Sequence, residues 1–301
     1  MQDFLNSKTK SDFFLENALY VVSTPIGNIY DITLRAIETF KKCDFVICED
    51  SRLSARLLNF LEIKKPFIIY NDHSDEQSRL KILDLIKDQK KSLCLVSDAG
   101  TPLISDPGYK LVNFLLENKV EVKSVPGACS VIAALSISGI QSDRFLFAGF
   151  VPHLKTQKEN FFKILVNTDS TLIFFESAQR ILNTLQNMLK IFGNRKAAIA
   201  REITKMHEEV KKDNLEDLVE YYSKNKIKGE IVILLSKPDS NNEQVNFDKI
   251  DEELKLALKT MKPKEAVALV ADNYNLNKKD LYQRMLKITT KKDEKDKKTK
   301  T

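Results

Sequence analysis

Short apolar runs alternate with amphipathic segments along the first half of the chain. The runs cover positions 19–22, 45–48, 67–70, 93–96 and 120–125. After the first of them, apolar residues recur every three or four positions at Ile32, Ala36 and Phe40, the spacing of a helix with one buried face. The same spacing follows the second and third runs. Because a polar loop comes after each run, this βα alternation predicts a mostly parallel sheet.

A second α/β pattern begins near Arg144. Strands are expected at 145–150, 171–175, 197–200 and 230–235, with helices near 161–166, 180–192 and 215–222. The stretch that follows, 237–246, is polar and contains Pro, Asp, Ser and Asn, a composition typical of a domain boundary.

The end of the chain is expected to be helical. Pro263 occupies a favourable helix-starting position, and Ala266, Leu269 and Val270 share one face of the helix that would follow. After a break at 273–277, a further helix is expected over 278–287, with three apolar residues on one face: Leu281, Met285 and Ile288. Two short helices around a brief turn resemble a helix-turn-helix, which either binds nucleic acid or serves only for packing.

These patterns divide the chain into six segments. They are a flexible arm (1–17), an N-terminal α/β domain (18–127), a C-terminal α/β domain (128–237), a linker (238–247), a helical module (248–290) and a basic tail (291–301). The expected fold is therefore two α/β domains with a small helical module behind them. The lysine-rich tail is expected to be solvated or to contact phosphate without specificity.

One loop, Ser97–Gly108, concentrates the residues that suggest a ligand site. It directly follows an apolar run and contains two Asp, two Gly and two Pro within twelve positions. A structural turn needs only one Gly or Pro, and loops at the carboxyl ends of strands form the ligand crevice of open α/β sheets. The loop therefore predicts a pocket for a cationic or hydroxyl-bearing ligand, the alternative being an elaborate connection.

Composition and charge exclude several classes of protein. No apolar run approaches the roughly 18 residues of a membrane helix, and residues 1–10 lack the apolar segment of a secretory signal, so a cytoplasmic protein without membrane contact is expected. The four cysteines show no C-x-x-C spacing, which disfavours a zinc site or a disulfide framework. The net charge of +6 is weak evidence for a polyanionic partner.

The commonest cofactor fingerprints are missing. The loop after the first apolar run contains Thr24-Pro25-Ile26-Gly27-Asn28 where a dinucleotide site would have G-x-G-x-x-G, and G-K-[ST] does not occur. A Rossmann cofactor site and a P-loop are therefore disfavoured.

Eight motifs in a fixed order carry a specific resemblance. They are V-S-T-P-I-G-N (22–28), E-D-S-R (49–52), D-H (72–73), the loop 97–108, P-G (126–127), E-S (176–177), A-R-E-I-T-K (200–205) and K-G-E (228–230). Together they resemble the ribosomal RNA small subunit methyltransferase I family, cytidine 2'-O-methyltransferases of the tetrapyrrole methylase superfamily. The resemblance runs from about Leu19 to Leu235, and the final module is similar to the helical domain appended in that family.

The resemblance implies S-adenosylmethionine bound in a cleft between the two α/β domains, and a homodimer that acts on 16S ribosomal RNA or the small ribosomal subunit. No metal is expected. By motif position the cofactor contacts fall on Asp98, Gly100, Thr101, Cys129, Ser130, Phe175 and Gly229. The chain departs from the family at Ala128, where Pro is usual, and at Phe175, where Tyr is frequent. Neither departure removes a charged group, but both leave the cofactor contacts open.

Methyl transfer to a ribose hydroxyl gains from alignment of donor and acceptor and from a base that takes the hydroxyl proton. Four residues are candidate bases, and the sequence does not choose among them: Asp50, His73, Glu176 and Glu202. Four residues are candidates for RNA phosphates, with salt bridges to neighbouring acids as the alternative: Arg52, Arg180, Arg201 and Lys205.

Two other functional hypotheses remain open. One is methylation of a small tetrapyrrole, and the other is a non-enzymatic regulator that binds nucleic acid through residues 263–288. The helical module and the basic tail favour a large polyanion, because a small planar substrate would give them no evident role.

Overall fold

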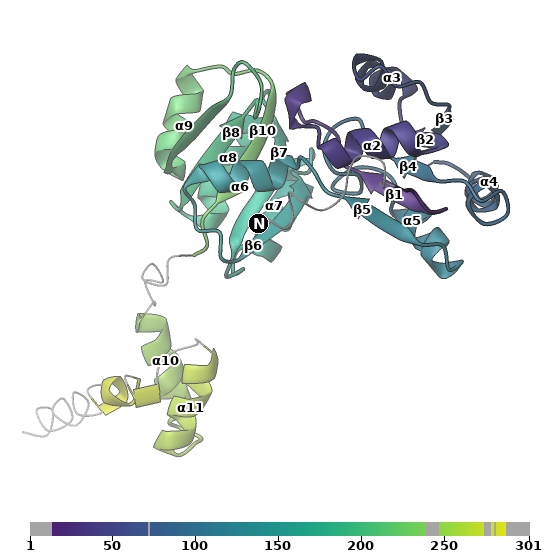
Figure 1. The fold of residues 1–301 in the computed structure, drawn as a ribbon. Helices are drawn as coiled ribbons and strands as arrows, with labels where there is room; N and C mark the ends of the chain where they lie inside the picture. Colours follow the sequence, from purple (N-terminus) through teal and green to yellow (C-terminus); the bar gives the residue numbers. More distant parts are fainter. Residues whose placement is uncertain (1–13, 72, 239–246, 274–277, 280, 287–301) are drawn as a thin grey trace, which may run out of the picture. The chain divides into compact units, whose positions relative to one another are not determined.

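A computed structural model of the chain describes residues 14–71, 73–238, 247–273, 278–279 and 281–286. The chain divides into two compact units at Pro238. The first unit contains two five-stranded sheets and their helices, and the second is helical (Figure 1). Within the described ranges, every helix is too short or too polar to cross a membrane.

The first sheet is parallel throughout, in the order β3-β2-β4-β1-β5. Its strands are β1 (Leu19–Val22), β2 (Phe45–Cys48), β3 (Phe67–Ile69), β4 (Leu93–Leu95) and β5 (Val122–Val125). The parallel sheet predicted from the βα alternation is therefore confirmed. Because β1 lies between β4 and β5, the loops after these three strands emerge side by side at one edge.

Helices cover both faces of this sheet. They are α2 (Leu34–Lys42) and α3 (Ser51–Phe60) on one face, and α4 (Glu76–Lys87) and α5 (Tyr109–Glu117) on the other, with a short 3-10 turn, η2 (Ile29–Asp31), before α2. Successive strand residues point to opposite faces. Val46 accordingly packs with the α2–α3 side and Ile47 with the α4–α5 side.

The second sheet is mixed, in the order β6-β7-β10-β8-β9. Its strands are β6 (Phe145–Phe150), β7 (Thr171–Ser177), β8 (Lys196–Arg201), β9 (Glu209–Asn214) and β10 (Glu230–Leu235). Strands β6 and β7 pair in parallel, and the other three neighbouring pairs of this sheet, β7–β10, β10–β8 and β8–β9, are antiparallel. The sequence pattern did not predict β9, because this edge strand has a single apolar residue, Val210, and is held by its pairing with β8.

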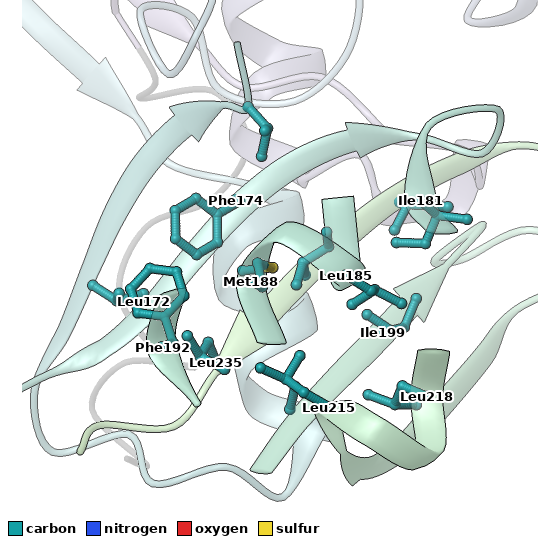
Figure 2. Packing of buried hydrophobic residues seen from close by; sticks show 14 of the residues in the cluster. Leu172, Phe174, Ile181, Leu185, Met188, Phe192, Ile199, Leu215, Leu218 and Leu235 are labelled. Atoms are coloured by element: carbon teal, nitrogen blue, oxygen red, sulfur yellow. The ribbon is translucent and has the colours of Figure 1, made fainter. Parts of the chain in front are cut away.

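Four helices pack on the second sheet. Three cover one face, α7 (Lys155–Leu165), α8 (Ile181–Phe192) and α9 (Leu215–Lys224), while α6 (Ser130–Ser138) covers the other. Figure 2 shows the larger core, where Leu185 and Met188 of α8 lie against Phe174 of β7. The pattern analysis missed α6, since its apolar residues are not confined to one stripe.

The described residues of the second unit include one helix that the sequence did not predict. Helices α10 (Phe247–Ala257) and α11 (Pro263–Asn273) precede the helical residues 278–279 and 281–286. Ile250 of α10 packs with Val270 and Leu281. Leu269 was expected to share a buried face with Ala266 and Val270, and this prediction is wrong because Leu269 is 43% exposed. Packing against the missed helix α10 moves the buried face of α11 toward Val267.

Several predicted features fall at or beyond the limits of the described residues. Ile288, residues 274–277 and the basic tail lie outside the described ranges, as do residues 1–13. The end of the predicted arm is described, and there the Glu16 backbone N–H donates to Tyr20 Oη at 3.0 Å. Glu16 also pairs with Lys123, so this part of the arm is attached to the first sheet.

Candidate active site

Hydrogen bonds join the three loops that follow β1, β4 and β5. Thr24 N donates to Gly100 O at 2.8 Å, and Gly100 N donates to Thr24 O at 3.1 Å. The Thr101 hydroxyl lies 2.9 Å from Ser23 Oγ and donates to Ala128 O at 3.0 Å. The loop Ser97–Gly108 therefore holds its two neighbours in place at the carboxyl edge of the first sheet.

These loops form one wall of a cleft of about 510 Å³, and the second sheet forms the other. This volume is typical of small-molecule sites, which span about 300–1,000 Å³. The first domain contributes Ile26 and the loop residues 99–101 and 104–106. The second domain contributes apolar side chains that include Phe150, Phe175, Ile203 and Val232.

Two glycines shape the cleft. Gly100 has φ +82° and Gly229 has φ +100°, values that side-chain-bearing residues rarely adopt. A Cβ on Gly100 would lie 3.2 Å from Ile26 Cγ2, and a Cβ on Gly229 would lie 2.6 Å from Glu202. A side chain at either position would therefore strain the backbone and crowd Ile26 or Glu202.

Six of the seven residues expected to contact the cofactor line this cleft: Gly100, Thr101, Cys129, Ser130, Phe175 and Gly229. Asp98 does not line it. This exposed residue lies beside a much smaller depression next to Leu53 and Ser54 of α3.

Glu176 lines the cleft, but both of its carboxylate oxygens are already engaged. Oε1 accepts from Ser177 N at 2.7 Å and lies 2.5 Å from Arg180 Nη2, while Oε2 accepts from Thr184 Oγ1 at 2.6 Å. The buried Lys158 in turn donates to Thr184 Oγ1 at 3.2 Å, and burial lowers the pKa of Lys158. Glu176 thus ties β7 to α8 through a buried polar network.

Asp50 and His73, two of the other candidate bases, are not among the residues that line the cleft. Asp50 caps α3, and its carboxylate lies 2.6 Å from Arg52 Nη2. The hydrogen bonds from Arg52 lower the pKa of Asp50 to about 2. His73 is exposed after β3, where its backbone N–H donates to Asn71 Oδ1 at 3.0 Å.

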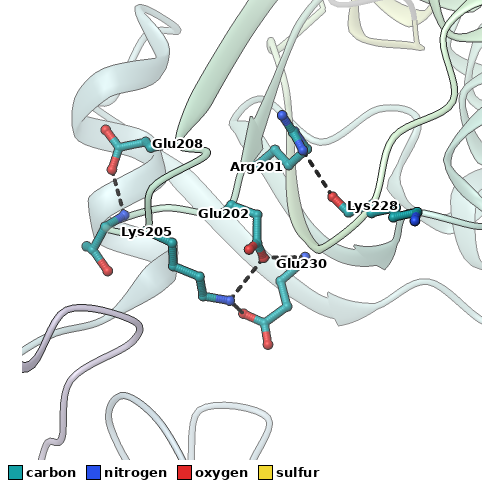
Figure 3. A network of polar contacts seen from close by, with 7 residues as sticks. Arg201, Glu202, Lys205, Glu208, Lys228 and Glu230 are labelled. Atoms are coloured by element: carbon teal, nitrogen blue, oxygen red, sulfur yellow. Dashed lines mark hydrogen bonds and ion pairs between the residues drawn. The ribbon is translucent and has the colours of Figure 1, made fainter.

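Glu202 belongs to an ion network beside the cleft (Figure 3). Its Oε1 accepts from Glu230 N and from Lys205 Nζ, each at 3.0 Å, and Lys205 also lies 2.9 Å from Glu230. The backbone bond from Glu230, followed by Lys205, lowers the pKa of Glu202. A Cβ on Gly27 would lie 2.6 Å from Lys205 Cγ, so this network touches the first loop of the other domain.

All four cations proposed for RNA form ion pairs, as the alternative interpretation expected. Their carboxylate partners are Asp50 for Arg52, Glu176 for Arg180, Glu209 for Arg201, and Glu202 and Glu230 for Lys205. Arg52 leaves 86% of its side chain exposed, whereas Arg180 leaves 20% and Arg201 leaves 21%. Contact with phosphate is therefore sterically easiest for Arg52.

The cleft also contains two titratable residues that the sequence analysis did not assign, Asp106 and His153. Burial raises the pKa of Asp106 to about 6, and the negative charges of Asp98 and Glu49 act in the same direction. Asp106 belongs to the loop selected for its two acids, so the sequence contained a signal for it. His153 follows β6 without any motif that would single it out.

Two family models match the chain. Residues 18–219 match Tetrapyrrole (Corrin/Porphyrin) Methylases, and residues 246–289 match the RsmI C-terminal HTH domain.

Curated relatives extend the match over nearly the whole chain. Proteins named ribosomal RNA small subunit methyltransferase I are 45% identical in Rickettsia prowazekii, over 89% of this chain and 96% of the relative, and 46% identical in Erythrobacter litoralis, over 92% and 97%. One from Thermotoga maritima is 40% identical over 218 residues, which are 72% of this chain and 97% of that protein.

Solved structures share the fold at low sequence identity. Diphthine synthase aligns with a TM-score of 0.56 and 16% identity, over 72% of this chain and 89% of that one. Uroporphyrin-III C-methyl transferase from Thermus thermophilus, complexed with S-adenosyl homocysteine, aligns with a TM-score of 0.52 and 19% identity, over 73% and 97%. With its two sheets, its helical second unit and these relatives, the chain belongs to the ribosomal RNA small subunit methyltransferase I family of the tetrapyrrole methylases.

Proposed function

We propose that this protein transfers a methyl group from S-adenosylmethionine to the ribose 2'-hydroxyl of a cytidine in 16S ribosomal RNA. The observation that carries the proposal is the cleft to which both α/β domains contribute, lined by six residues assigned to the cofactor by motif position. The relatives' names specify ribosomal RNA of the small subunit. The uroporphyrin methyltransferase structure contains S-adenosyl homocysteine, the product that such a donor leaves.

The cleft fits the parts of S-adenosylmethionine. Ile26, Phe175 and Val232 provide apolar surface for an adenine ring, while the hydroxyl of Ser130 can bond a polar group. When bound, the donor supplies a methyl carbon attached to a sulfonium.

The protein's contribution is mainly positional. The bridged loops of the first domain and the β7–β10 wall of the second hold two reactants at a fixed separation. Alignment of this kind accounts for about 7–11 kcal/mol of barrier reduction in favourable cases. A base that accepts the hydroxyl proton adds about 10²–10⁴-fold.

We assign methyl transfer to the first unit and additional RNA contact to the second. The Thermotoga maritima relative supports this division. Its match to this chain covers 218 residues, which are 97% of that protein, so the relative is too short to contain both units. Among the candidate cations, we propose Arg52 as the phosphate contact, because its side chain stays 86% exposed beside its partner Asp50. The side chains of the other three cations are at most 28% exposed.

We also propose that the protein acts in the cytoplasm as a homodimer. Outside the cleft, the edge strand β6 exposes two large apolar side chains, with 42% of Phe145 and 39% of Leu146 accessible. Apolar groups gathered on an unpaired edge are typical of an interface. Light scattering of the purified protein tests this, and a monomeric mass at micromolar concentration contradicts it.

Methyl transfer assays distinguish the hypotheses. The protein is incubated with radiolabelled S-adenosylmethionine and either small ribosomal subunits, 16S ribosomal RNA or a porphyrinogen, and the modified nucleotide is mapped by mass spectrometry. We expect label in a cytidine ribose of the RNA. Label only in the porphyrinogen would refute the proposal in favour of a tetrapyrrole methylase, and RNA binding without any transfer would indicate a regulator.

A further inference from the structure

We propose that Asp106 is the general base of the reaction, accepting the proton of the attacking hydroxyl. The inference rests on the proposed methyl transfer. It assigns to this site a residue that was not among the candidate bases from the sequence.

The position of Asp106 supports this role. Its side chain lines the cleft together with Thr101 and Ser130, on the wall opposite Phe175 and Glu176. A hydroxyl brought into the cleft would therefore be in the same cleft as this carboxylate.

The backbone on the N-terminal side of Asp106 is strained. Leu103 (φ +72°) and Ser105 (φ +64°) both adopt the left-handed conformation, although neither is glycine. Such residues are strained and persist where the surrounding structure fixes them, often at active sites. Here Leu103 packs into the core beneath α5, and Gly108 ends the loop with Leu95 beside it. These contacts hold the strained backbone on the N-terminal side of Asp106 in place.

The other charged groups of the cleft are less suited to act as a base. Both oxygens of Glu176 accept hydrogen bonds, Arg180 is paired with it, and Glu230 is paired with Lys205. His153 is exposed in the loop after β6. Asp106 is half-buried and carries no ion pair among the described residues.

The environment of Asp106 gives its carboxylate the basicity that the reaction requires. Burial and the charges of Asp98 and Glu49 raise its pKa to about 6, against one hydrogen bond from Ser97 that lowers it. The most effective base has a pKa near the working pH. Asp106 is thus ionised at neutral pH, yet binds a proton more strongly than an ordinary aspartate.

The step balances without a further reactant. As the ribose oxygen forms its bond to the methyl carbon, the carbon–sulfur bond breaks and its electron pair returns to sulfur, leaving a neutral thioether. The O–H bond breaks and its proton passes to the Asp106 carboxylate. Solvent then removes this proton from the carboxylic acid.

The test compares the wild type with Asp106→Asn, Asp106→Glu and a control, Asp88→Asn, at an exposed position at the end of α4. Rates of methylation of small ribosomal subunits are measured from about pH 5 to about pH 9. Binding of S-adenosylmethionine is measured by calorimetry. The Asn variant should bind the donor within about threefold of wild type, lose about 10²–10⁴-fold in kcat and lose the fall in rate below about pH 6. The Glu variant should keep this fall in rate at low pH, the acidic limb of the pH profile. The control should match wild type.

Each other outcome overturns a defined part of the argument. A kcat of the Asn variant close to wild type refutes the role of Asp106 while leaving the proposed function intact. Loss of donor binding with the acidic limb retained makes Asp106 a binding group. An acidic limb that disappears in His153→Gln assigns the base to His153. If wild type transfers no methyl group to any RNA, the proposed function itself fails. Should the Asn variant not fold, the pH profiles of wild type and the Glu variant decide.

Discussion

Replacement of Glu176 by glutamine tests whether this carboxylate holds the cleft together or performs chemistry. Its side chain is completely buried between β7 and α8 and accepts from Ser177 N and Thr184 Oγ1. It also carries the charge opposite Arg180, whose side chain is 80% covered. Glutamine keeps the shape, but it removes that charge and places an NH₂ donor against one of the existing donors.

The expected cost follows from these contacts. Removing one partner of a buried ion pair costs about 3–5 kcal/mol. This cost is smaller here because 20% of the Arg180 side chain is exposed to water, and because glutamine keeps one oxygen that can accept a hydrogen bond. We therefore expect Glu176→Gln to lower the free energy of unfolding by about 2–3 kcal/mol. That is a large fraction of the about 5–15 kcal/mol available to a typical protein. With an m-value of about 2 kcal/mol per molar urea, the midpoint should fall by roughly 1 M.

Urea unfolding followed by circular dichroism measures the shift. The matched control is Glu159→Gln, which removes the same charge from a longer pair, at 3.4 Å, with Lys190. Because 70% of the Lys190 side chain is exposed and can be solvated, this change should cost less than about 1 kcal/mol. A Glu176→Gln variant as stable as the control, yet with methyl transfer reduced more than about 100-fold, would refute the structural role and make Glu176 a catalytic residue.

Three further predictions concern the cleft. Asp98→Ala should leave the unfolding midpoint unchanged, because Asp98 is an exposed loop residue; calorimetric titration with S-adenosylmethionine tests its assignment, and unchanged affinity would remove it from the site. Gly229→Ala should destabilise the protein by about 1–3 kcal/mol, because its φ is +100° and the new Cβ would lie 2.6 Å from Glu202; Gly139→Ala, also at positive φ but beside the flexible end of Lys212, should cost less in the same urea titration. Since the pKa of Asp106 is raised to about 6 in the folded protein, against about 3.9 when unfolded, the folded state binds more protons between these values and wild-type stability falls as pH rises through that window. Asp106→Asn should therefore gain stability relative to wild type above about pH 6 and not below about pH 4, and identical Tm–pH curves for the two proteins would contradict the raised pKa.

Local patterns were sufficient for much of the fold. Apolar runs predicted every strand of the first sheet, because a buried parallel strand must be apolar on both faces. The density of Asp, Gly and Pro in Ser97–Gly108 identified the loop that organises the cleft, since a chain that turns repeatedly needs those residues. Motif order then placed Thr101 and Ser130 in one site, although 28 positions separate them.

Other features depended on contacts between distant segments. Strand β9 and helix α6 lack the periodicity of an amphipathic element, and they form because β8 and the second sheet offer them a partner. The sequence alone determined two α/β patterns and an acidic, glycine-rich loop at a strand end, and its family resemblance implied a cleft between the two domains. Only the tertiary structure decided which acid is ion-paired: Glu176 meets Arg180 and Thr184, whereas Asp106 lines the cleft without an ion pair among the described residues. Identical carboxylates acquire different roles because burial and neighbouring charges, which are set by folding, control their hydrogen bonds and their affinity for a proton.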